Sequence, residues 1–481
     1  MSKNMDYPDV EMLVGGKWIM ADPRPVQDPC SGAVIGERAH ATAAHIDEAV
    51  DAASSGMREW WDLGPAGRES VMVKAASLLR ERVEQIARII TLEEGKTLRE
   101  ARGEILRAAS YIEWDAHEGR RLYGRIVPST DDYQLAVHRR PVGLVAGFSP
   151  WNFPIGSPTR KIGGALAAGC GVILKAAEDT PGAARQLVQA FVDAGIPDGA
   201  LSLVFGDPPA ISEQLLAHPD VRMITFTGSV AVGKHLAALA GAQMKPALME
   251  LGGHCPVFVS ATADIRAAAR STAMVKAMNA GQVCVSPTRF FVEEAAFDAF
   301  AEEMATAAGA VRLGSGLDEA TEMGPLINRR RLDSIAGLVD EARADGAEIL
   351  AGGAQADRPG NFYPLTVLAD VPENARIMRE EPFGPVALLV RVKDVDQAIE
   401  RANSVAYGLA GYAFTNSARD MQRLSSRLEV GNLAINHLMA SDADLPFGGV
   451  KDSGLGREGG AEGPLNHTIV KTVSTLFLDV N

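Results

Sequence analysis

One cysteine of this chain lies in a setting that suits chemistry better than packing. Cys284 sits in the run NAGQVCVSPT, between a Gly-Gln step and a Ser-Pro break, whereas structural thiols usually have apolar neighbours. A thiol attacks a substrate only as the thiolate, and near neutral pH that state needs a base, a helix N-terminus or nearby donors. Other stretches of the sequence should therefore supply such groups.

A carboxylate at the end of a predicted strand is the first of these groups. Glu250 closes the apolar run in LMELGG and is followed by two glycines. A carboxylate beside flexible backbone can turn toward a thiol or a water, as a general base must. Taken alone, the pattern also fits a solvated glutamate at a strand-to-loop junction.

An amide held between aromatic rings is the second group. Asn152 stands between Trp151 and Phe153, with prolines on both sides, directly after the predicted strand VGLVAGF. A fixed side-chain N–H, together with the backbone N–H of the nucleophile, stabilises an oxyanion. The alternative is a proline-bracketed turn that serves only packing.

A strand-to-helix turn is the third group. The run ITFTGSVAVGK places Gly228 and Ser229 between a predicted strand and a predicted helix. Helix N-termini bind anions, and a glycine there lets a pyrophosphate approach the backbone. The run lacks the GxGxxG spacing, so on its own it fits an ordinary turn equally well.

The elements that must position these residues alternate along the chain. Short apolar runs separated by amphipathic stretches fill residues 142–260 and again 262–436, which predicts an α/β fold with two doubly wound parallel-sheet domains. A hairpin signal precedes them at 13–18. Helical patterns lie near 43–60, 68–86, 97–118, 294–309 and 394–404.

Two further segments alternate polar and apolar residues but have no evident partner in either domain. They cover residues 121–140 and 469–480. Because unpaired strand edges are usually covered, we expect a small β arm that pairs with another subunit. The expected assembly is a homodimer or a homotetramer.

Composition excludes several classes of protein. A net charge of −14 without a basic stripe argues against a nucleic-acid partner. We find no signal-peptide pattern and no apolar run long enough for a membrane span, and the four cysteines lack disulfide-like spacing. We therefore expect a cytoplasmic protein with reduced thiols and no membrane partner. No CxxC or HExxH pattern suggests a metal site.

Six motifs in chain order make the chain resemble the aldehyde dehydrogenase superfamily over essentially its whole length. They are PWNFP, TFTGS, MELGG, NAGQVC, EEPFGPV and PFGGVKDSGLGRE. The resemblance implies oxidation of an aldehyde to a carboxylic acid through a cysteine thiohemiacetal and a thioester. It implies Cys284 as nucleophile, Glu250 as general base, and Asn152 with the Cys284 backbone N–H as the oxyanion hole. Lys161 and Glu458 are similar to the proton-relay pair of that family.

The same resemblance implies a dinucleotide cofactor. Lys175 and Glu178 match positions that contact the adenosine ribose, and a carboxylate there would repel a 2′-phosphate, so we expect NAD in preference to NADP. The other cofactor residues that the resemblance implies are Trp151, Gly228, Ser229, Glu381 and Phe383. The expected segments are a dinucleotide-binding domain at 1–120 and 141–251, a catalytic domain at 252–446, a return segment to the cofactor domain at 447–464, and oligomerisation strands at 121–140 and 465–481.

Within the superfamily, the chain resembles bacterial NAD-dependent succinate-semialdehyde and α-ketoglutaric-semialdehyde dehydrogenases. The resemblance lies in WDAHEGRRLYGRIVP, GQVCVSPTRFFV, YGLAGYAFT and RLEVGNLAIN. Those enzymes oxidise aldehydes that carry a remote carboxylate, and Arg160 matches one of their carboxylate-binding arginines. Met278, six residues before Cys284, replaces the second arginine. We expect an ω-semialdehyde such as succinate semialdehyde, with a bulkier apolar or aromatic aldehyde as the alternative.

The loop HLMASDADLPF, at residues 437–447, lies where relatives line the substrate entrance. Ser441 is the expected polar contact to the substrate. Asp442 and Asp444 would disfavour an anionic ligand if they pointed inward, and the expectation is that they face solvent.

Two histidines leave a different enzyme class open. A Cys-dependent hydrolase would pair Cys284 with His254 or His437 and would need no nucleotide. It would leave the cofactor residues without a role. We interpret His254 and Cys255 as packing variants, and a non-catalytic scaffold as a third class that the intact Cys-Glu-Asn set argues against.

Overall fold

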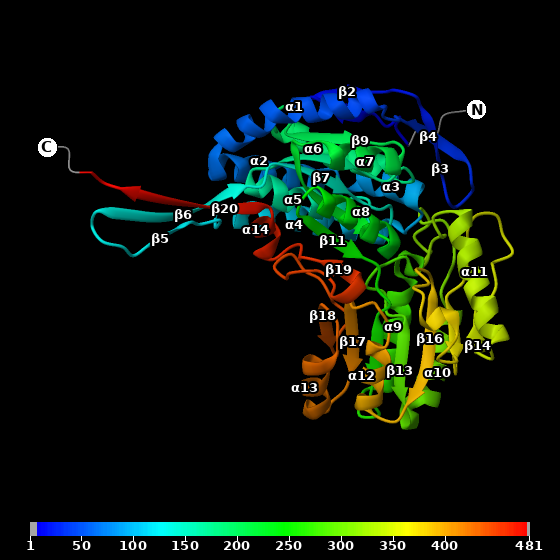
Figure 1. Ribbon diagram of the computed structural model, residues 1–481. Helices are drawn as coiled ribbons and strands as arrows, with labels where there is room; N and C mark the ends of the chain where they lie inside the picture. The colour runs from blue at the N-terminus through cyan, green and yellow to red at the C-terminus, as the bar shows by residue number, and fades with distance from the viewer. Residues whose placement is uncertain (1–6, 479–481) are drawn as a thin grey trace.

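Two mostly parallel sheets with flanking helices form the two halves of the chain, and an antiparallel arm projects from one of them (Figure 1). The computed structural model describes residues 7–478. The fold is the α/β architecture expected from the alternation of apolar runs and amphipathic stretches. None of the helices among these residues is long and apolar enough to cross a membrane.

The first sheet has eight strands in the order β19-β11-β10-β7-β8-β9-β1-β2. Its five central strands are parallel, and their near-continuous apolar runs are buried because helices cover a parallel sheet. The parallel strands are β7 (Leu144–Phe148), β8 (Gly171–Lys175), β9 (Leu201–Val204), β10 (Val221–Gly228) and β11 (Ala247–Leu251); the antiparallel edge strands are β1 (Met12–Val14), β2 (Lys17–Ile19) and β19 (Gly454–Leu455). The hairpin predicted at 13–18 is confirmed as β1 and β2.

The order in which successive strands are added to this sheet switches sides between β7 and β10, which are parallel to each other. From β7 the next strands along the chain, β8 and β9, lie on one side, whereas β10 and β11 lie on the other. Such a switch point opens a crevice at the carboxyl ends of the strands. The PWNFP turn follows β7 and Ser229 follows β10, so the fold places both at this crevice.

Eight helices belong to this half. They are α1 (Ala43–Asp62), α2 (Gly64–Glu81), α3 (Val83–Glu94), α4 (Leu98–Gly119), α5 (Gly156–Ala168), α6 (Pro181–Ala194), α7 (Pro208–Ala217) and α8 (Val230–Ala242). The helix predicted at 68–86 is wrong in extent, because the chain breaks at Arg82 into α2 and α3. No glycine or proline marks that break in the sequence, so the local pattern did not predict it.

The second sheet has the order β14-β15-β16-β13-β12-β17-β18, parallel except for β14. Its strands are β12 (Pro256–Val259), β13 (Arg289–Glu293), β14 (Glu348–Ala351), β15 (Thr366–Ala369), β16 (Val386–Val392), β17 (Ala410–Phe414) and β18 (Asn432–Ile435). The alternation of runs grouped PVFVS with the first series, whereas the expected catalytic domain at 252–446 included it. The run forms β12, an inner strand of this second sheet. The glycine pair after β11 lets the chain leave one sheet and enter the other.

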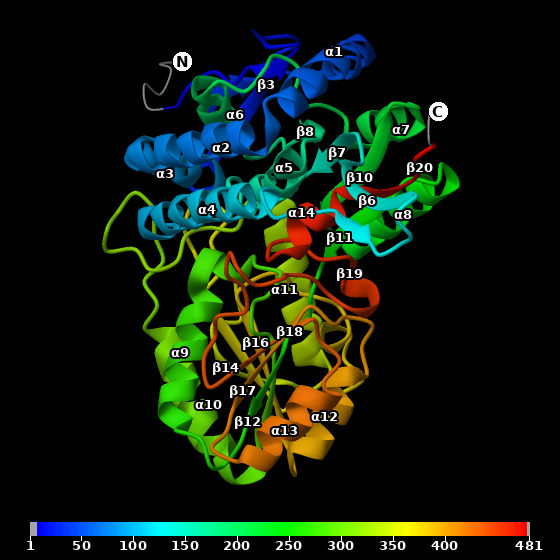
Figure 2. The ribbon, with the colours of Figure 1, turned by 90° about the vertical axis from the view of Figure 1, so that its left-hand side faces the viewer.

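The helices of the second half follow the predicted pattern. They are α9 (Ile265–Ala277), α10 (Glu294–Gly309), α11 (Arg329–Ala344), α12 (Val395–Asn403) and α13 (Ala418–Arg427), with short 3-10 turns η1 (Met278–Gly281), η2 (Arg376–Met378) and η3 (Lys451–Ser453). The remaining small elements are the hairpin β3 (Arg24–Gln27) and β4 (Val34–Arg38), and α14 (Glu462–Asn466). Figure 2 shows α4 along the lower border of the first half, where the second half begins.

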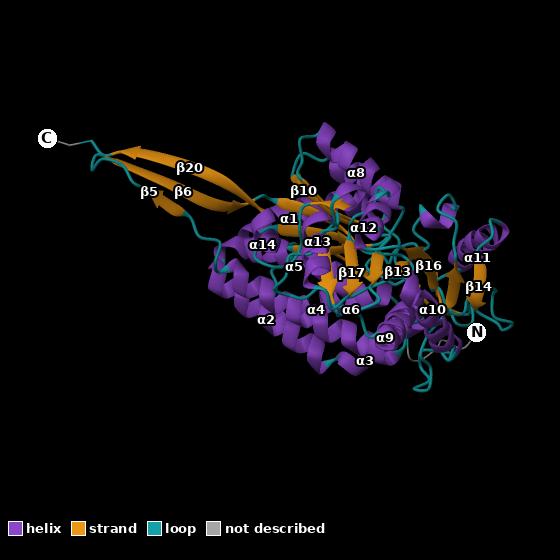
Figure 3. Cartoon of the chain, turned by 90° about the horizontal axis from the view of Figure 1, so that it is seen from below, coloured by secondary structure: helices purple, strands orange, loops and turns teal. Residues whose placement is uncertain are grey.

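The arm is a three-stranded antiparallel sheet that extends away from both halves (Figures 1 and 3). Its strands are β5 (Arg125–Val127), β6 (Tyr133–Pro141) and β20 (Thr468–Leu476). β20 pairs with β6 along its full length, so the two segments that lacked a partner in sequence are partners of each other. Residues 479–481 of the predicted oligomerisation strands, and residues 1–6 of the predicted cofactor domain, lie outside the described residues.

Candidate active site

A cavity of about 1100 Å³ lies where the two halves of the chain meet. It is lined from the first half by β10, β11 and the turn after β7, and from the second half by the loop after α9 and by α11. Twelve residues singled out in the sequence line it: Trp151, Asn152, Arg160, Gly228, Ser229, Glu250, Met278, Cys284, Glu381, Phe383, Ser441 and Glu458. Lys161, Lys175 and Glu178 do not line it.

Cys284 lies three residues after η1, in a segment of unusual backbone geometry. Asn279 and Ala280 adopt left-handed φ angles of 50° and 51°, which residues other than glycine seldom adopt. These turns end α9 and direct the chain into the cavity. Burial raises the pKa of the Cys284 thiol, and the nearby carboxylate of Glu381 raises that pKa further. The thiol therefore requires a base before it can attack.

Glu250 ends β11 and is 3% exposed. Neither of its carboxylate oxygens has a hydrogen-bond partner among the described residues. Burial raises the pKa of this carboxyl, and the neighbouring Glu458 raises it further. A buried, unpartnered carboxylate is costly to keep, and a raised pKa makes it a stronger base near neutral pH. Its position in the cavity fits proton removal from Cys284 or from a water.

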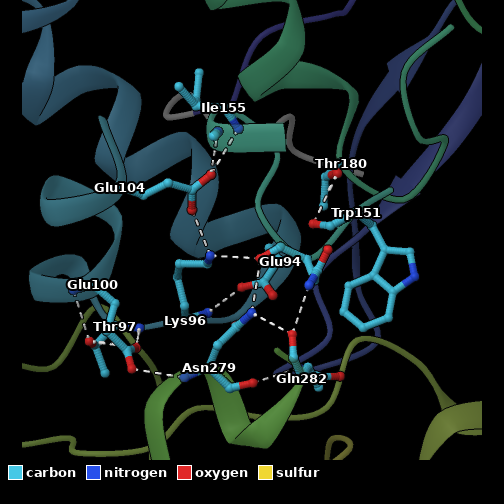
Figure 4. Close-up of polar contacts among 12 residues, drawn as sticks. Glu94, Lys96, Thr97, Glu100, Glu104, Trp151, Ile155, Thr180, Asn279 and Gln282 are labelled. Atoms are coloured by element: carbon cyan, nitrogen blue, oxygen red, sulfur yellow. Dashed lines mark hydrogen bonds and ion pairs between the residues drawn. The ribbon is translucent and has the colours of Figure 1, made fainter. Parts of the chain in front are cut away.

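Asn152 is held by hydrogen bonds to residues far from it in the sequence, which the local PWNFP pattern does not indicate. Its Nδ2 donates to the carbonyl oxygen of Gln282 at 2.9 Å, which leaves the second amide N–H for another acceptor. The backbone carbonyl oxygen of Asn152 accepts from Lys96 Nζ at 2.8 Å and from Asn279 Nδ2 at 2.9 Å. Figure 4 shows Lys96, Asn279 and Gln282 converging on this region. Sequence reasoning missed all three, because a buried lysine or amide looks like a surface one in the sequence.

Behind Glu250, Lys161 and Glu458 form a buried ion pair. Thr225 Oγ1 also donates to Glu458 Oε1, at 3.3 Å. Lys161 is adjacent to Arg160 on α5, yet only Arg160 lines the cavity. Lys161 therefore contacts a cavity-lining carboxylate, Glu458, and its charge also lowers the pKa of Glu250.

Three of the predicted cofactor residues, Lys175, Glu178 and Ser229, lie at or just after the carboxyl ends of parallel strands of the first sheet. Ser229 is the N-cap of α8, and its side chain makes no capping hydrogen bond. Ser229 and the first residues of α8 line the cavity, so the hydroxyl and the helix N-terminus are available to bind an anion. Lys175 and Glu178 form an ion pair of 2.7 Å after β8, the strand next to β7. These groups suit the pyrophosphate and a ribose of a dinucleotide.

Glu381 and Phe383 come from the second half. Glu381 Oε1 accepts from the backbone N–H of Gly253 at 3.1 Å, and burial raises the pKa of Glu381 to about 8. A Cβ on Gly252 would lie 2.2 Å from Glu381 Oε2, so this approach requires glycine. The ring of Phe383 meets that of Trp151 edge-on, with centroids 5.7 Å apart. This aromatic pair forms an apolar wall suited to a nicotinamide ring.

Arg160, on α5, also lines the cavity. Its guanidinium donates to Ser441 Oγ at 2.7 Å and lies 4.0 Å from the ring centroid of Tyr111 and 5.2 Å from that of Phe447. Tyr111 and Arg107, four residues apart on α4, also line the cavity. The sequence analysis missed both, although their helical spacing of four places them on one face of α4.

Neither histidine of the hydrolase hypothesis lines the cavity; in the described part of the chain its lining includes no histidine at all. The His254 ring instead bonds the carbonyl oxygen of Ile377, and burial lowers its pKa well below the usual range. Cys255 is buried, with its Sγ donating to the Cys284 carbonyl oxygen. These contacts agree with packing roles for both residues.

The acidic residues of the entrance loop do not enter the cavity. Asp442 and Asp444 are exposed and absent from its lining. They place no negative charge beside Arg160.

Three comparisons bear on this site. The profile of the aldehyde dehydrogenase family matches residues 18–473. The 4-(hydroxymethyl)benzenesulfonate dehydrogenase of Comamonas testosteroni is 43% identical over 466 residues, which cover 95% of this chain and 96% of that protein. The NADP(+) succinate-semialdehyde dehydrogenase of Escherichia coli K12 is 38% identical and covers 96% of each chain. A crystal structure of succinate-semialdehyde dehydrogenase from Burkholderia pseudomallei superposes with a TM-score of 0.95 at 36% identity, over 99% of each chain.

Because the carboxylates of Glu381 and Glu250 raise the pKa of the Cys284 thiol, removal of one of them should change the pH dependence of its alkylation. We expect Glu381→Gln to shift the pH midpoint of Cys284 alkylation by iodoacetamide downward, because losing a nearby negative charge stabilises the thiolate. Peptide mass spectrometry without nucleotide would follow each cysteine separately. Cys30, whose pKa is raised by burial and by Asp28, serves as internal control and should not change. An unchanged midpoint at Cys284 would contradict this electrostatic picture.

Proposed function

The chain belongs to the aldehyde dehydrogenase family, and from that premise we propose that Cys284 carries the oxidation of an anionic aldehyde with NAD as hydride acceptor. One observation supports this assignment above the others. The thiol, the unpartnered carboxylate of Glu250 and the fixed amide of Asn152 line one cavity, although they lie on three separate segments of the chain.

The first half of the reaction ends at a thioester. Glu250 removes the Cys284 proton, and the thiolate sulfur attacks the aldehyde carbon while the carbonyl electron pair moves to oxygen. The free N–H of the Asn152 amide and the Cys284 backbone N–H stabilise that oxyanion. A bound nicotinamide dinucleotide supplies the hydride acceptor. Collapse of the oxyanion re-forms the carbonyl as hydride leaves, which gives the thioester.

The second half releases the acid. Glu250 takes a proton from a water whose oxygen attacks the thioester carbon, and the C–S bond breaks to regenerate the thiolate. Glu458 and Lys161 lie behind Glu250 as a route for that proton. The raised pKa of Glu250 fits a group that must accept protons in both halves.

For the cofactor we favour NAD over NADP. Glu178 holds one carboxylate oxygen on Lys175 and the other on the Gly206 backbone N–H, at 3.0 Å, so it is a fixed negative charge at the crevice. A 2′-phosphate would meet that charge. The E. coli relative uses NADP(+) by its name, so the preference needs direct measurement. A higher kcat/KM with NADP than with NAD would contradict it.

For the substrate we propose an ω-semialdehyde such as succinate semialdehyde. Arg160 and its hydroxyl neighbour Ser441 line the cavity and offer donors to the remote carboxylate of such a substrate. Two of the compared proteins carry succinate-semialdehyde in their names.

A second candidate is an aromatic aldehyde with a remote acid group. Met278 provides an apolar wall where an arginine was expected, and Tyr111 and Phe447 flank Arg160. A ring would pack against these side chains while its acid group reached the guanidinium. The relative named for a benzenesulfonate substrate, 43% identical, adds support.

The nucleophile is tested by Cys284→Ala. This variant should lose aldehyde-dependent NADH formation, because no other thiol lines the cavity in the described part of the chain, while calorimetry should show NAD binding retained. Cys30→Ala is the matched control and should keep wild-type turnover. Measurable turnover of Cys284→Ala would overturn the assignment.

The substrate is tested with succinate semialdehyde, 4-carboxybenzaldehyde, hexanal and benzaldehyde. Arg160→Leu should lower kcat/KM for the two anionic aldehydes roughly 10- to 100-fold, since a charged hydrogen bond contributes about 1.5–3 kcal/mol. Hexanal and benzaldehyde should change little. Met278→Arg should favour succinate semialdehyde over 4-carboxybenzaldehyde. A tenfold wild-type preference for hexanal or benzaldehyde would exclude an anionic substrate.

We also infer that the arm joins copies of this chain. Apolar side chains of its strands are exposed, among them Ile126, Ile469 and Val470. Sedimentation velocity should give a dimer or tetramer of the 50.9 kDa chain, and Ile469→Asp with Val470→Asp should dissociate it. Met244→Lys, at an exposed methionine outside the arm, should not. A monomeric wild-type protein would disprove the inference.

A further inference from the structure

The two loops that carry Asn152 and Cys284 meet at the N-terminal turns of α4. Neither loop belongs to α4, and they come from different halves of the chain (Figure 2). The residues that join them are Lys96, Glu100 and Glu104, none of which the proposed reaction uses (Figure 4).

Lys96 and Glu104 form a buried ion pair, with Nζ 2.6 Å from Oε2 and side chains 1% and 2% exposed. Both partners also bond the backbone of the Asn152 turn. Lys96 Nζ donates to the Asn152 carbonyl oxygen at 2.8 Å, and Glu104 Oε1 accepts from the Ile155 and Gly156 backbone N–H groups at 2.9 and 3.0 Å. The turn is thus fixed at Asn152 by Lys96, and at Ile155 and Gly156, where α5 begins, by Glu104.

Glu100, four residues before Glu104, holds the other loop. Its Oε2 accepts from the backbone and hydroxyl of Thr97, which closes the capping box of α4, and its Oε1 accepts from the Asn279 backbone N–H at 2.9 Å. Asn279 in turn donates to the Asn152 carbonyl oxygen. The left-handed backbone of Asn279 and Ala280 is therefore fixed by α4 on one side and by the Asn152 turn on the other.

The charge on Lys96 is maintained despite its burial. Desolvation acts to lower the pKa of Lys96, but Glu104 and Glu94 outweigh it and hold that pKa above the usual value. An ammonium with three donors can satisfy a carboxylate and a carbonyl at once, which a neutral side chain of this length cannot.

We propose that Lys96 and Glu104 are positioning residues for the oxyanion hole: through their bonds to the Asn152 turn they set its amide against the Cys284 loop. Glu104 also lines the cavity, whereas Lys96 does not. The inference rests on the proposed function. Buried ion pairs add little stability on average, so a pair that bonds three backbone groups of one catalytic turn is better explained by the geometry it imposes. Displacement of a catalytic group by about 1 Å can cost on the order of a hundredfold in rate.

The chain offers a matched control for this pair. Glu93, on α3, is a buried carboxylate that accepts from the Gly182 and Ala183 backbone N–H groups at the start of α6, as Glu104 does at the start of α5. Glu93 does not line the cavity. Its replacement removes the same kind of helix-terminal contact without touching the Asn152 turn.

The test uses Lys96→Met, Glu104→Gln and Glu93→Gln in the full-length enzyme, each alone and in an Asn152→Ala background. Lys96→Met should lower kcat about tenfold or more with the KM for NAD unchanged, and Glu104→Gln, which keeps the shape, should fall between it and wild type. Hydrolysis of p-nitrophenyl acetate, which needs the thiol and oxyanion hole but no nucleotide, should fall in parallel. Glu93→Gln should stay within about twofold of wild type in both assays.

The Asn152→Ala background separates positioning from general loss of structure. If Lys96 acts through the amide, Lys96→Met should lower kcat no further there. Equal losses in both backgrounds, or a wild-type kcat in Lys96→Met and Glu104→Gln, would overturn the proposal. If Lys96→Met does not fold, as checked by circular dichroism, Glu104→Gln carries the same comparison. Turnover by Cys284→Ala would instead refute the proposed function.

Discussion

Removal of ionisable groups from water is the constraint on which this site depends. Cys284, Glu250 and Glu381 lie together where two sheets meet, and burial raises the pKa of each. The carboxylates of Glu381 and Glu250 raise the pKa of the Cys284 thiol further. Burial of these groups is costly to the fold, and the raised pKa of Glu250 makes its carboxylate more basic than an exposed one.

The surrounding structure compensates by giving most other buried charges fixed partners. Lys96 pairs with Glu104, and Lys161 pairs with Glu458. Glu250 differs from these two pairs, because neither of its carboxylate oxygens has a hydrogen-bond partner among the described residues. Its lack of a partner alone does not mark it as reactive, since Asp115 is also a buried carboxylate with an unpartnered oxygen. Glu250 differs from Asp115 in that it lines the cavity together with Cys284.

Prediction from the sequence succeeded where a local pattern encodes the structure. The apolar runs that became β7, β8 and β10 are buried on both faces, so they were recognisable without their neighbours. The alternation of runs alone grouped PVFVS with the wrong sheet, because period and composition do not tell which sheet a buried strand joins. The expected domain boundary at residue 252 placed the run in the second half. The strand β14 (Glu348–Ala351) was missed, and none of its four residues is fully buried. The break at Arg82 depends on packing rather than on a helix-breaking residue.

The sequence by itself determined the α/β class, the reactive residue types of Cys284, Glu250 and Asn152, and the resemblance to a family. These follow from short-range features, namely hydrophobic period, glycine and proline placement, and motif order. The tertiary structure alone decided which polar groups meet. Lys96 reaches the carbonyl of Asn152, and Arg107 lines the cavity with Arg160, through contacts between segments more than fifty residues apart. A local pattern reports which apolar positions are buried, whereas the burial and the partner of a polar residue depend on how distant segments are folded together.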